Sequence, residues 1–217
     1  MRMFHRPKRV AALSAALVAA VALALVPGAQ AHNTKAPPAA PADSDTLLWA
    51  GATTVALDPG AGAALKSLGI SVAPTKPVYA SKAGISFPIT LGVVDTTSLA
   101  GQIRHAGGLV FTKGDTKVYL TRYFINIDET PSLSGLVGVG APGTARADLF
   151  DLDLSGLKVD AGKRYITLSG VGLNLTQGAA DALNTAFGEG ATPFTAGLKI
   201  GTATVKARTW TVPANGW

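Results

Sequence analysis

The sequence predicts an all-β fold, an antiparallel β-sandwich or barrel-like sandwich that carries two short helices. The prediction rests on three observations about residues 46–211. This stretch is rich in β-branched residues and glycine, its apolar and polar side chains alternate over short runs, and turn-forming residues separate those runs. Short strands with glycine turns between them are typical of antiparallel sandwiches and barrels.

The clearest predicted strand covers residues 85–93. Apolar residues alternate along it with polar or small ones, so one face is expected to be buried and the other not. Pro88 has no backbone N–H to donate to a neighbouring strand. We therefore expect this strand to lie at an edge of the sheet or to contain a bulge. The alternating apolar residues are Ile85, Phe87, Ile89, Leu91 and Val93.

A hairpin is predicted where residues 109–111 and 118–120 flank the turn residues Lys113-Gly114-Asp115. The remaining strands follow from short β-branched runs with turn residues between them. These further strands are predicted at residues 119–127, 133–139, 145–154, 163–168, 171–175 and 198–210.

Two short helices are predicted from their end signals. The first begins after the N-cap Asp58 with Pro59 at its first position and ends at Gly69. The second begins after Thr176 and ends at Gly188. A strand precedes each helix, so a strand–cap–helix unit occurs twice, which is either chance in an alanine-rich chain or a trace of pseudo-symmetry.

A Sec-type signal peptide is predicted for residues 1–31. A basic start is followed by an apolar, alanine-rich run over residues 10–26, and Ala29-Gln30-Ala31 gives the small-x-small pattern of a cleavage site. The alternative is an uncleaved membrane anchor, but the run is at the short end for spanning about 30 Å of hydrocarbon. We expect cleavage after Ala31.

The domain organisation follows from changes in composition. Residues 32–45 are rich in proline and alanine and predict a linker, residues 46–211 predict the β domain, and residues 212–217 predict a short tail. We expect no membrane span after cleavage of the signal peptide. The product is expected to be secreted and extracellular, or associated with the cell envelope.

Charge and cysteine content exclude several function classes. The chain carries a formal charge of +6, with 19 basic and 13 acidic residues, but four of the basic residues lie in the acid-free signal segment. The remainder therefore carries about +2, so the overall charge does not make a nucleic-acid or membrane-surface partner, or a basic patch, the leading hypothesis. The absence of cysteine excludes disulfides, thiolate metal sites and cysteine nucleophiles.

His105 is the one histidine inside the predicted domain. Strand parity places it on the apolar face, together with Leu99, Ile103, Leu109 and Phe111, unless a bulge at the following glycines reverses the parity. Such a histidine is either a hydrogen-bonded core residue or a ligand or base. A histidine-rich metal site is excluded, because the chain lacks the ligands.

Few sequence features suggest a catalytic site. No Gly-x-Ser-x-Gly elbow occurs. Asp151 and Asp153 share one strand face, opposite Phe150, Leu152 and Leu154. The two carboxylates either form a solvated strand face or act in glycoside chemistry.

Tyrosines are the other candidate ligands. Tyr119 and Tyr123 are expected on the same face of one strand, with Arg122 on the other. A phenolate can bind ferric haem, and a tyrosine in a strand can equally be an ordinary packing residue. The sequence leaves both readings open.

Three short motifs occur in order along residues 98–205: a glycine-rich strand around His105, an aspartate-containing strand, and a strand end followed by paired alanines and a phenylalanine. The motifs are Gly101-x-Ile103-x-His105-x-Gly107-Gly108-Leu109-x-Phe111, Ala147-Asp148-Leu149-Phe150-Asp151-Leu152, and Leu173-x-Leu175-Thr176 with Ala179-Ala180 and Phe187. In this order they resemble the HtaA domain of secreted and surface actinobacterial proteins.

The resemblance implies an all-β extracellular module, with haem binding and haem-iron uptake as the activity of some members. The histidine of the family corresponds to His105. The haem-ligating tyrosine of the family lies in an early strand opened by a tryptophan, and here no tyrosine follows Trp49 in that strand. A second family tyrosine near the closing phenylalanine is also missing after Phe187.

Together these observations predict an exported, non-catalytic β-sandwich binding module that takes haem or another hydrophobic small molecule through His105, Tyr119 and Tyr123. The first alternative is a structural or interaction protein of the cell surface, with the strand around Pro88 as a docking edge for a surface protein. The second is a polysaccharide hydrolase. A haem binder requires His105 or a tyrosine exposed in a pocket, a structural protein predicts a buried histidine and no pocket, and a hydrolase predicts carboxylates that face each other across a cleft.

Overall fold

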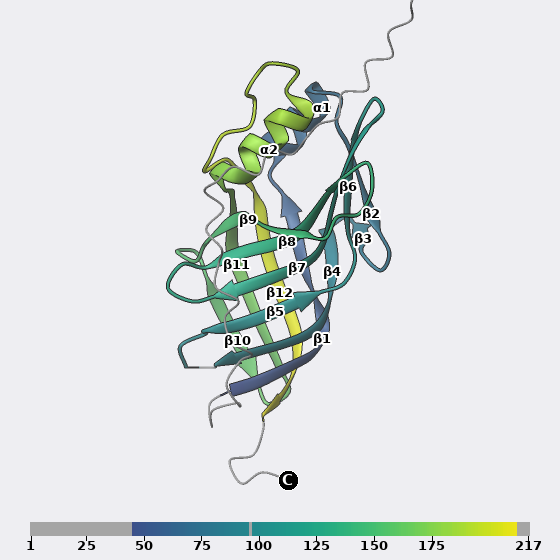
Figure 1. Cartoon of the computed structure of the whole chain (residues 1–217). Helices are drawn as coiled ribbons and strands as arrows, with labels where there is room; N and C mark the ends of the chain where they lie inside the picture. Colours follow the sequence, from purple (N-terminus) through teal and green to yellow (C-terminus); the bar gives the residue numbers. More distant parts are fainter. Residues whose placement is uncertain (1–44, 96, 212–217) are drawn as a thin grey trace, which may run out of the picture. The chain divides into compact units, whose positions relative to one another are not determined.

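One antiparallel sheet of twelve strands makes up most of the structure, a computed structural model that describes residues 45–95 and 97–211. Eight of its strands form a continuous ring, because β7 pairs with β8 as well as with β5 (Figure 1). In the order in which they are bonded, the eight strands are β7 (Thr116–Ile127), β5 (Gly101–His105), β4 (Gly84–Asp95), β1 (Asp45–Leu57), β12 (Lys199–Thr211), β11 (Tyr165–Leu175), β9 (Ala145–Asp153) and β8 (Ser132–Val139).

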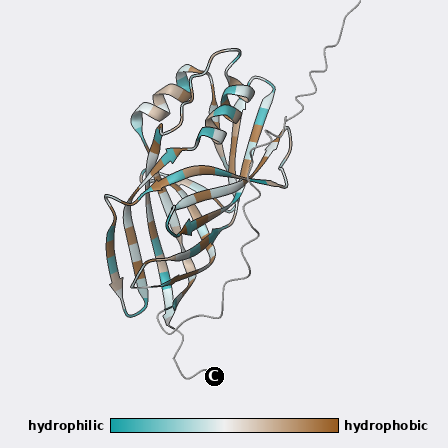
Figure 2. Ribbon diagram, turned by 60° about the vertical axis from the view of Figure 1, so that its left-hand side comes forward, coloured by the Kyte–Doolittle hydropathy of each residue, from teal (hydrophilic) through white to brown (hydrophobic). Residues whose placement is uncertain are grey.

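The closed ring confirms the all-β class and makes the sheet barrel-like. Hydrophobic and hydrophilic residues alternate along its strands (Figure 2), so each strand turns one set of side chains inward. The largest fully buried side chains are Phe187, Leu48, Ile103, Ile166 and Val94. All of these strands belong to one compact unit. A chain that begins at His32 therefore keeps the whole sheet and its core.

Four further strands extend the ring. β6 (Gly108–Lys113) forms the predicted hairpin with β7, in which Phe111 pairs with Val118 and Gly114 adopts a positive φ of 53° in the turn. β2 (Ser71–Thr75) pairs with β6, β3 (Tyr79–Ser81) with β4, and β10 (Lys158–Gly162) with β11. These last three strands are short and mostly exposed, so they lack the apolar alternation by which a strand is predicted.

Pro88 does not lie on an edge strand, which corrects one prediction. β4 pairs with β1 along one side, and along the other side with β3 over residues 84–86 and with β5 over residues 89–94. Pro88 lies where one partner replaces the other, and the pairing with β5 shifts register between Ile89 and Leu91. The predicted bulge is therefore confirmed. The docking edge around Pro88 is lost, because both sides of the strand are occupied.

A second irregularity joins two predicted strands. Residues 163–168 and 171–175 belong to the single strand β11, which contains a bulge between Ser169 and Val171. Gly170 lies in this bulge with a φ of +83°, a conformation that glycine adopts without steric penalty. The turn signal at this glycine therefore marks a bulge and not the end of a strand.

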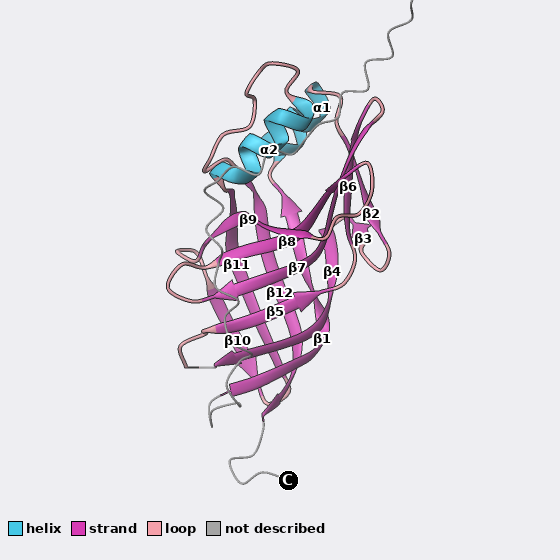
Figure 3. Ribbon diagram, viewed as in Figure 1, coloured by secondary structure: helices cyan, strands magenta, loops and turns pink. Residues whose placement is uncertain are grey.

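The two helices form as their end signals predict. In α1 (Pro59–Ser67) the Asp58 Oδ1 accepts from the Gly60 backbone N at 2.8 Å, and in α2 (Gln177–Phe187) the Thr176 Oγ1 accepts from the Ala179 backbone N at 3.1 Å. Both helices lie at the same end of the closed sheet (Figure 3). Their preceding strands, β1 and β11, flank β12 on its two sides, so the repeated strand–cap–helix unit is also repeated in space.

Candidate functional site

The closed sheet surrounds an apolar cavity of about 150 Å³. Its walls are aliphatic and aromatic side chains that point inward from all eight strands of the ring, with additions from β2, β6 and α1. The three residues with polar side-chain atoms in these walls are Thr53, His105 and Tyr123.

The cavity reaches the surface beside α1. Leu57, the last residue of β1, lines the cavity and is nevertheless 44% exposed. Leu65 of α1 lines the same region. The lining of the cavity therefore extends to a partly exposed residue at the end of the sheet that carries the helices.

His105 lies inside this cavity, as strand parity predicts. Its side chain is 4% exposed, and the other four residues predicted for the same face, Leu99, Ile103, Leu109 and Phe111, line the cavity as well. Gly107 adopts a positive φ of 78° between β5 and β6 without reversing the parity. The sequence analysis treated a buried histidine and a histidine in a pocket as alternatives. His105 is both, because it is buried and also lines the cavity.

The imidazole of His105 has one nitrogen that is satisfied and one that is not. Nε2 lies 2.7 Å from the Thr53 Oγ1, whereas Nδ1 is buried without a hydrogen-bond partner. Burial lowers the pKa of His105 from 6.5 to about 4, and a backbone interaction with Tyr123 opposes this shift in part. The ring is therefore neutral at pH 7. Its second nitrogen can act as a donor or an acceptor, depending on the tautomer, but it is fully buried, so a ligand in the cavity would meet it only after a small shift of the surrounding side chains.

Thr53 is a site residue that sequence reasoning missed. It is 3% exposed and points inward from β1 with Val55 and Leu57, which also line the cavity. A signal was present, because Thr53 is a polar residue on the apolar face of an alternating run. Its partner across the cavity lies 52 residues further along the chain, and the sequence gives no indication of that pairing.

Tyr123 lines the cavity with its hydroxyl already engaged. The side chain is 5% exposed, donates to the Leu120 carbonyl oxygen at 2.8 Å, and packs edge-on against Phe87 with ring centroids 5.2 Å apart. Burial raises the pKa of the Tyr123 phenol far above its ordinary value of 10, so the group stays neutral.

Tyr119 does not share the face of Tyr123, which corrects the sequence prediction. Arg122, between them, adopts a positive φ of 51°, and the pairing of β7 with β8 shifts register between Thr121 and Phe124. The shift reverses inward and outward positions along β7. Val118 and Leu120 are buried before the bulge and Tyr123 after it, so Tyr119 does not line the cavity.

The two aspartates of β9 lie on its outer face. Asp151 and Asp153 are exposed, while Phe150, Leu152 and Leu154 line the cavity, as the strand pattern predicts. In the register with β11 their opposite residues are an asparagine and a glycine. The hydrolase alternative requires two carboxylates that face each other across a cleft. Asp151 and Asp153 do not form such a pair.

Two absences apply to the described part of the chain. Residues 45–95 and 97–211 contain no group of three histidine, aspartate or glutamate side chains placed to hold a metal ion. No helix within these ranges is long and apolar enough to cross a membrane. The predicted signal peptide and tail, and the linker before Asp45, lie outside the described residues.

Comparison with solved structures shows which folds this chain is similar to. The chain matches no protein-family model and no curated protein. It aligns with the C-terminal domain of HtaA from Corynebacterium glutamicum at a TM-score of 0.59 and 16% identity, over 76% of this chain and 99% of that domain. A domain-swapped dimer of a histidine-to-alanine variant of the same domain aligns at a TM-score of 0.50 and 17% identity, over 70% and 94%.

The heme-binding protein HtaB from the same organism aligns at a TM-score of 0.48 and 11% identity, over 76% of this chain and 95% of that one. The fold of this chain, a closed antiparallel sheet with two helices at one end, is similar to that of the HtaA C-terminal domain. The resemblance predicted from the motifs is confirmed at the level of the fold.

Proposed function

We propose that this chain is an exported, non-catalytic binding module that holds a small hydrophobic molecule inside its closed sheet. The observation that carries the proposal is the apolar cavity, with the fully buried and unpartnered Nδ1 of His105 in its wall. A buried polar atom without a partner costs a protein about 1–3 kcal/mol. A ligand that offers Nδ1 a hydrogen bond would remove that cost and gain affinity from the apolar walls.

The volume of the cavity supports a specific size of ligand. A cavity of about 150 Å³ lined by aliphatic and aromatic side chains stays dry and accepts a molecule such as benzene. A single ring with one polar substituent matches both the volume and the one free nitrogen. Thr53 would hold the imidazole in place, because its hydroxyl engages Nε2.

The non-catalytic part of the proposal is supported by what surrounds His105. Within the cavity the side-chain hydroxyls are those of Thr53 and Tyr123, and no carboxylate is among the lining residues. The Tyr123 hydroxyl is occupied by the Leu120 carbonyl. His105 thus has no carboxylate partner that would orient its imidazole and stabilise the imidazolium formed when a general base accepts a proton.

Haem is the second candidate, and the likeness of the fold to an HtaA domain favours it. The residues present do not fit it in this form of the cavity. The neutral His105 has a free nitrogen that suits a metal, but the Tyr123 phenol is neutral and engaged. The cavity is also smaller than the ~300–1,000 Å³ typical of pockets for drug-sized ligands.

Binding of phenol and toluene to a chain that begins at His32 tests the proposal. Calorimetry is expected to show one-to-one binding of both compounds. In the variant Thr53→Val/His105→Leu, which removes both polar partners together, the phenol-to-toluene affinity ratio is expected to fall about fivefold, the equivalent of one hydrogen bond. Tyr119→Phe, which changes a residue outside the cavity, is the matched control and should keep the ratio. Binding of neither compound to the folded protein would refute the proposal.

A haemin titration separates the second candidate from the first. Absorbance in the Soret region reports haem binding. Saturable one-to-one binding that weakens in His105→Ala would assign haem as the ligand instead. A flat titration, beside binding of phenol, would assign the smaller ligand class.

A further inference from the structure

An exposed cluster of aromatic and basic side chains lies away from the cavity. Trp49 is 51% exposed, Trp210 52% and Tyr165 48%, although each is a large hydrophobic residue. They come from β1, β12 and β11, which are neighbours in the sheet. We name this surface the aromatic–basic patch. Its residues are Trp49, Arg164, Tyr165, Lys206, Arg208 and Trp210.

The pairing of the strands brings these residues together. Arg208 pairs with Tyr165 on β11, and on its other side it faces the β1 bulge in which Trp49 is the extra residue. Neighbouring strands lie about 4.8 Å apart, so Trp49 and Tyr165 flank Arg208 closely. Trp49 points outward because it follows Leu48, which is completely buried, and successive side chains of a strand lie on opposite faces.

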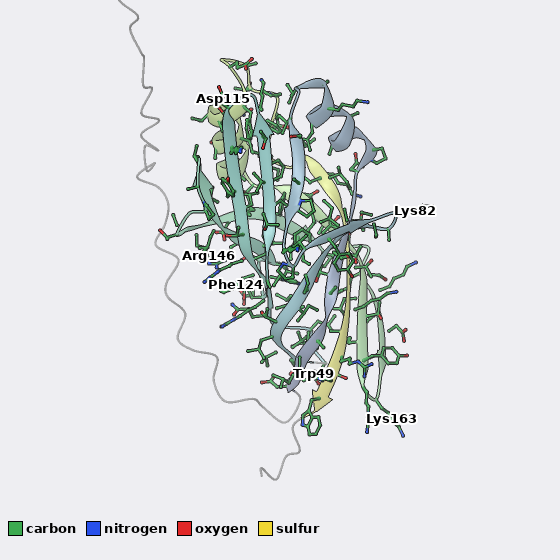
Figure 4. All side chains as sticks on the ribbon, turned by 90° about the vertical axis from the view of Figure 1, so that its right-hand side faces the viewer. Trp49, Lys82, Asp115, Phe124, Arg146 and Lys163 are labelled. Atoms are coloured by element: carbon green, nitrogen blue, oxygen red, sulfur yellow. The ribbon has the colours of Figure 1, made fainter. Side chains whose placement is uncertain are left out.

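The charge of this region is positive. Lys163 and Arg164 form the turn between β10 and β11, and the Thr209 N donates to the Arg164 carbonyl oxygen at 3.1 Å, which holds this turn beside β12. Figure 4 shows Lys163 and Trp49 at the end of the sheet distant from α1. Four basic residues, Lys163, Arg164, Lys206 and Arg208, stand against three acidic ones, Asp45, Asp160 and Asp95, which pairs with Asp45.

The basic residues of this region are available to a partner. Within the described ranges none of these four side chains forms an ion pair. The Asp160 carboxylate lies 3.5 Å from the Tyr165 hydroxyl. The patch therefore keeps a surplus of cations around three half-exposed aromatic rings.

We propose that the aromatic–basic patch docks this domain onto an anionic lipid surface. The surplus of lysine and arginine selects a negatively charged partner, and each such residue near an anionic membrane strengthens binding about fivefold. Tryptophan and tyrosine combine an apolar body with a polar tip, and they concentrate at the boundary between headgroups and hydrocarbon. A bilayer offers charge above an apolar layer, whereas a polysaccharide offers no such layer. None of the patch residues lines the cavity, so the two proposals are independent.

Vesicle sedimentation of the chain that begins at His32 tests this inference. We expect binding to vesicles that contain phosphatidylglycerol, and at least tenfold weaker binding to pure phosphatidylcholine. Lys206→Glu/Arg208→Glu should weaken binding to the anionic vesicles more than tenfold, and Trp49→Ser/Trp210→Ser about tenfold. The matched control is Tyr79→Ser/Lys82→Glu, which removes an exposed aromatic and a basic residue elsewhere (Figure 4) and should leave binding unchanged. Circular dichroism confirms that each variant is folded.

Three results would overturn the inference. The first is equal binding to the two kinds of vesicle, or binding to neither. The second is loss of binding in the control variant equal to that in the patch variants. The third is full binding to anionic vesicles after Trp49→Ser/Trp210→Ser, together with equally tight binding of soluble dextran sulfate, which would assign a soluble polyanion as the partner.

Discussion

Acidification from pH 7 to pH 4 is expected to remove about 3 kcal/mol of stability through His105 alone. The pKa of His105 is about 4 in the folded protein and 6.5 in the unfolded chain. Below pH 6.5 the unfolded chain therefore binds a proton that the folded protein refuses. The contribution of this residue to stability is complete above pH 6.5 and is lost progressively as the pH falls towards 4.

Urea unfolding of two proteins at a series of pH values measures this effect. Other carboxyl groups also titrate in acid, so the informative quantity is the difference between the original protein and Thr53→Val/His105→Leu. That difference should change by about 3 kcal/mol between pH 7 and pH 4, with the original protein losing more. Parallel pH profiles would mean that His105 is accessible to protons in the folded state, contrary to its burial.

The second large effect is expected when the cavity is filled. Ala203 points inward from β12 and lines the cavity, whereas Ala207, four residues along the same strand, is equally buried but does not line it. Ala203→Leu places three extra carbon atoms in the empty space, so binding of phenol and toluene should fall at least tenfold. Stability should be unchanged or higher by about 0.5–2 kcal/mol, as is common for cavity-filling substitutions.

Ala207→Leu is the control for this substitution because the same side chain enters packed core. It should lower the free energy of unfolding by about 1–3 kcal/mol and leave ligand affinity intact. Calorimetry and urea unfolding of both variants give the two quantities. If Ala203→Leu binds both compounds as well as the original protein does, the ligand site is elsewhere.

The features that sequence predicts well are those encoded locally. The cap residues Asp58 and Thr176 set the helix starts through hydrogen bonds to backbone N–H groups two or three residues away. The inward face of β5 follows from alternation alone, and it places His105 correctly. Each of these inferences needs no more than one strand or one helical turn.

Positions that depend on irregular backbone were predicted less well. The bulge at Arg122 moves Tyr119 and Tyr123 to different faces, and arginine gives no warning of a positive φ, since glycine and asparagine are the residues that commonly adopt it. Pro88 was expected at an edge or at a bulge because it lacks an N–H, and the bulge was confirmed while the edge was not. Pro88 lies instead where β4 exchanges β3 for β5, a place where a missing donor is tolerated.

The cavity itself depends on contacts between distant parts of the chain. Its wall is continuous around the ring because β7 pairs with β8. The bond between Thr53 and His105 crosses from β1 to β5, two strands that are separated in the sheet by β4. Neither relation leaves a pattern within one segment of sequence, so the site could be predicted only in part, through His105 and Tyr123.

A crystal structure of the protein soaked in phenol tests the central claim most directly. The account predicts one phenol inside the closed sheet, with its oxygen within about 3.2 Å of the His105 Nδ1 and its ring against the apolar walls. An interior without phenol, in which an ordered water satisfies the His105 Nδ1, would contradict the account.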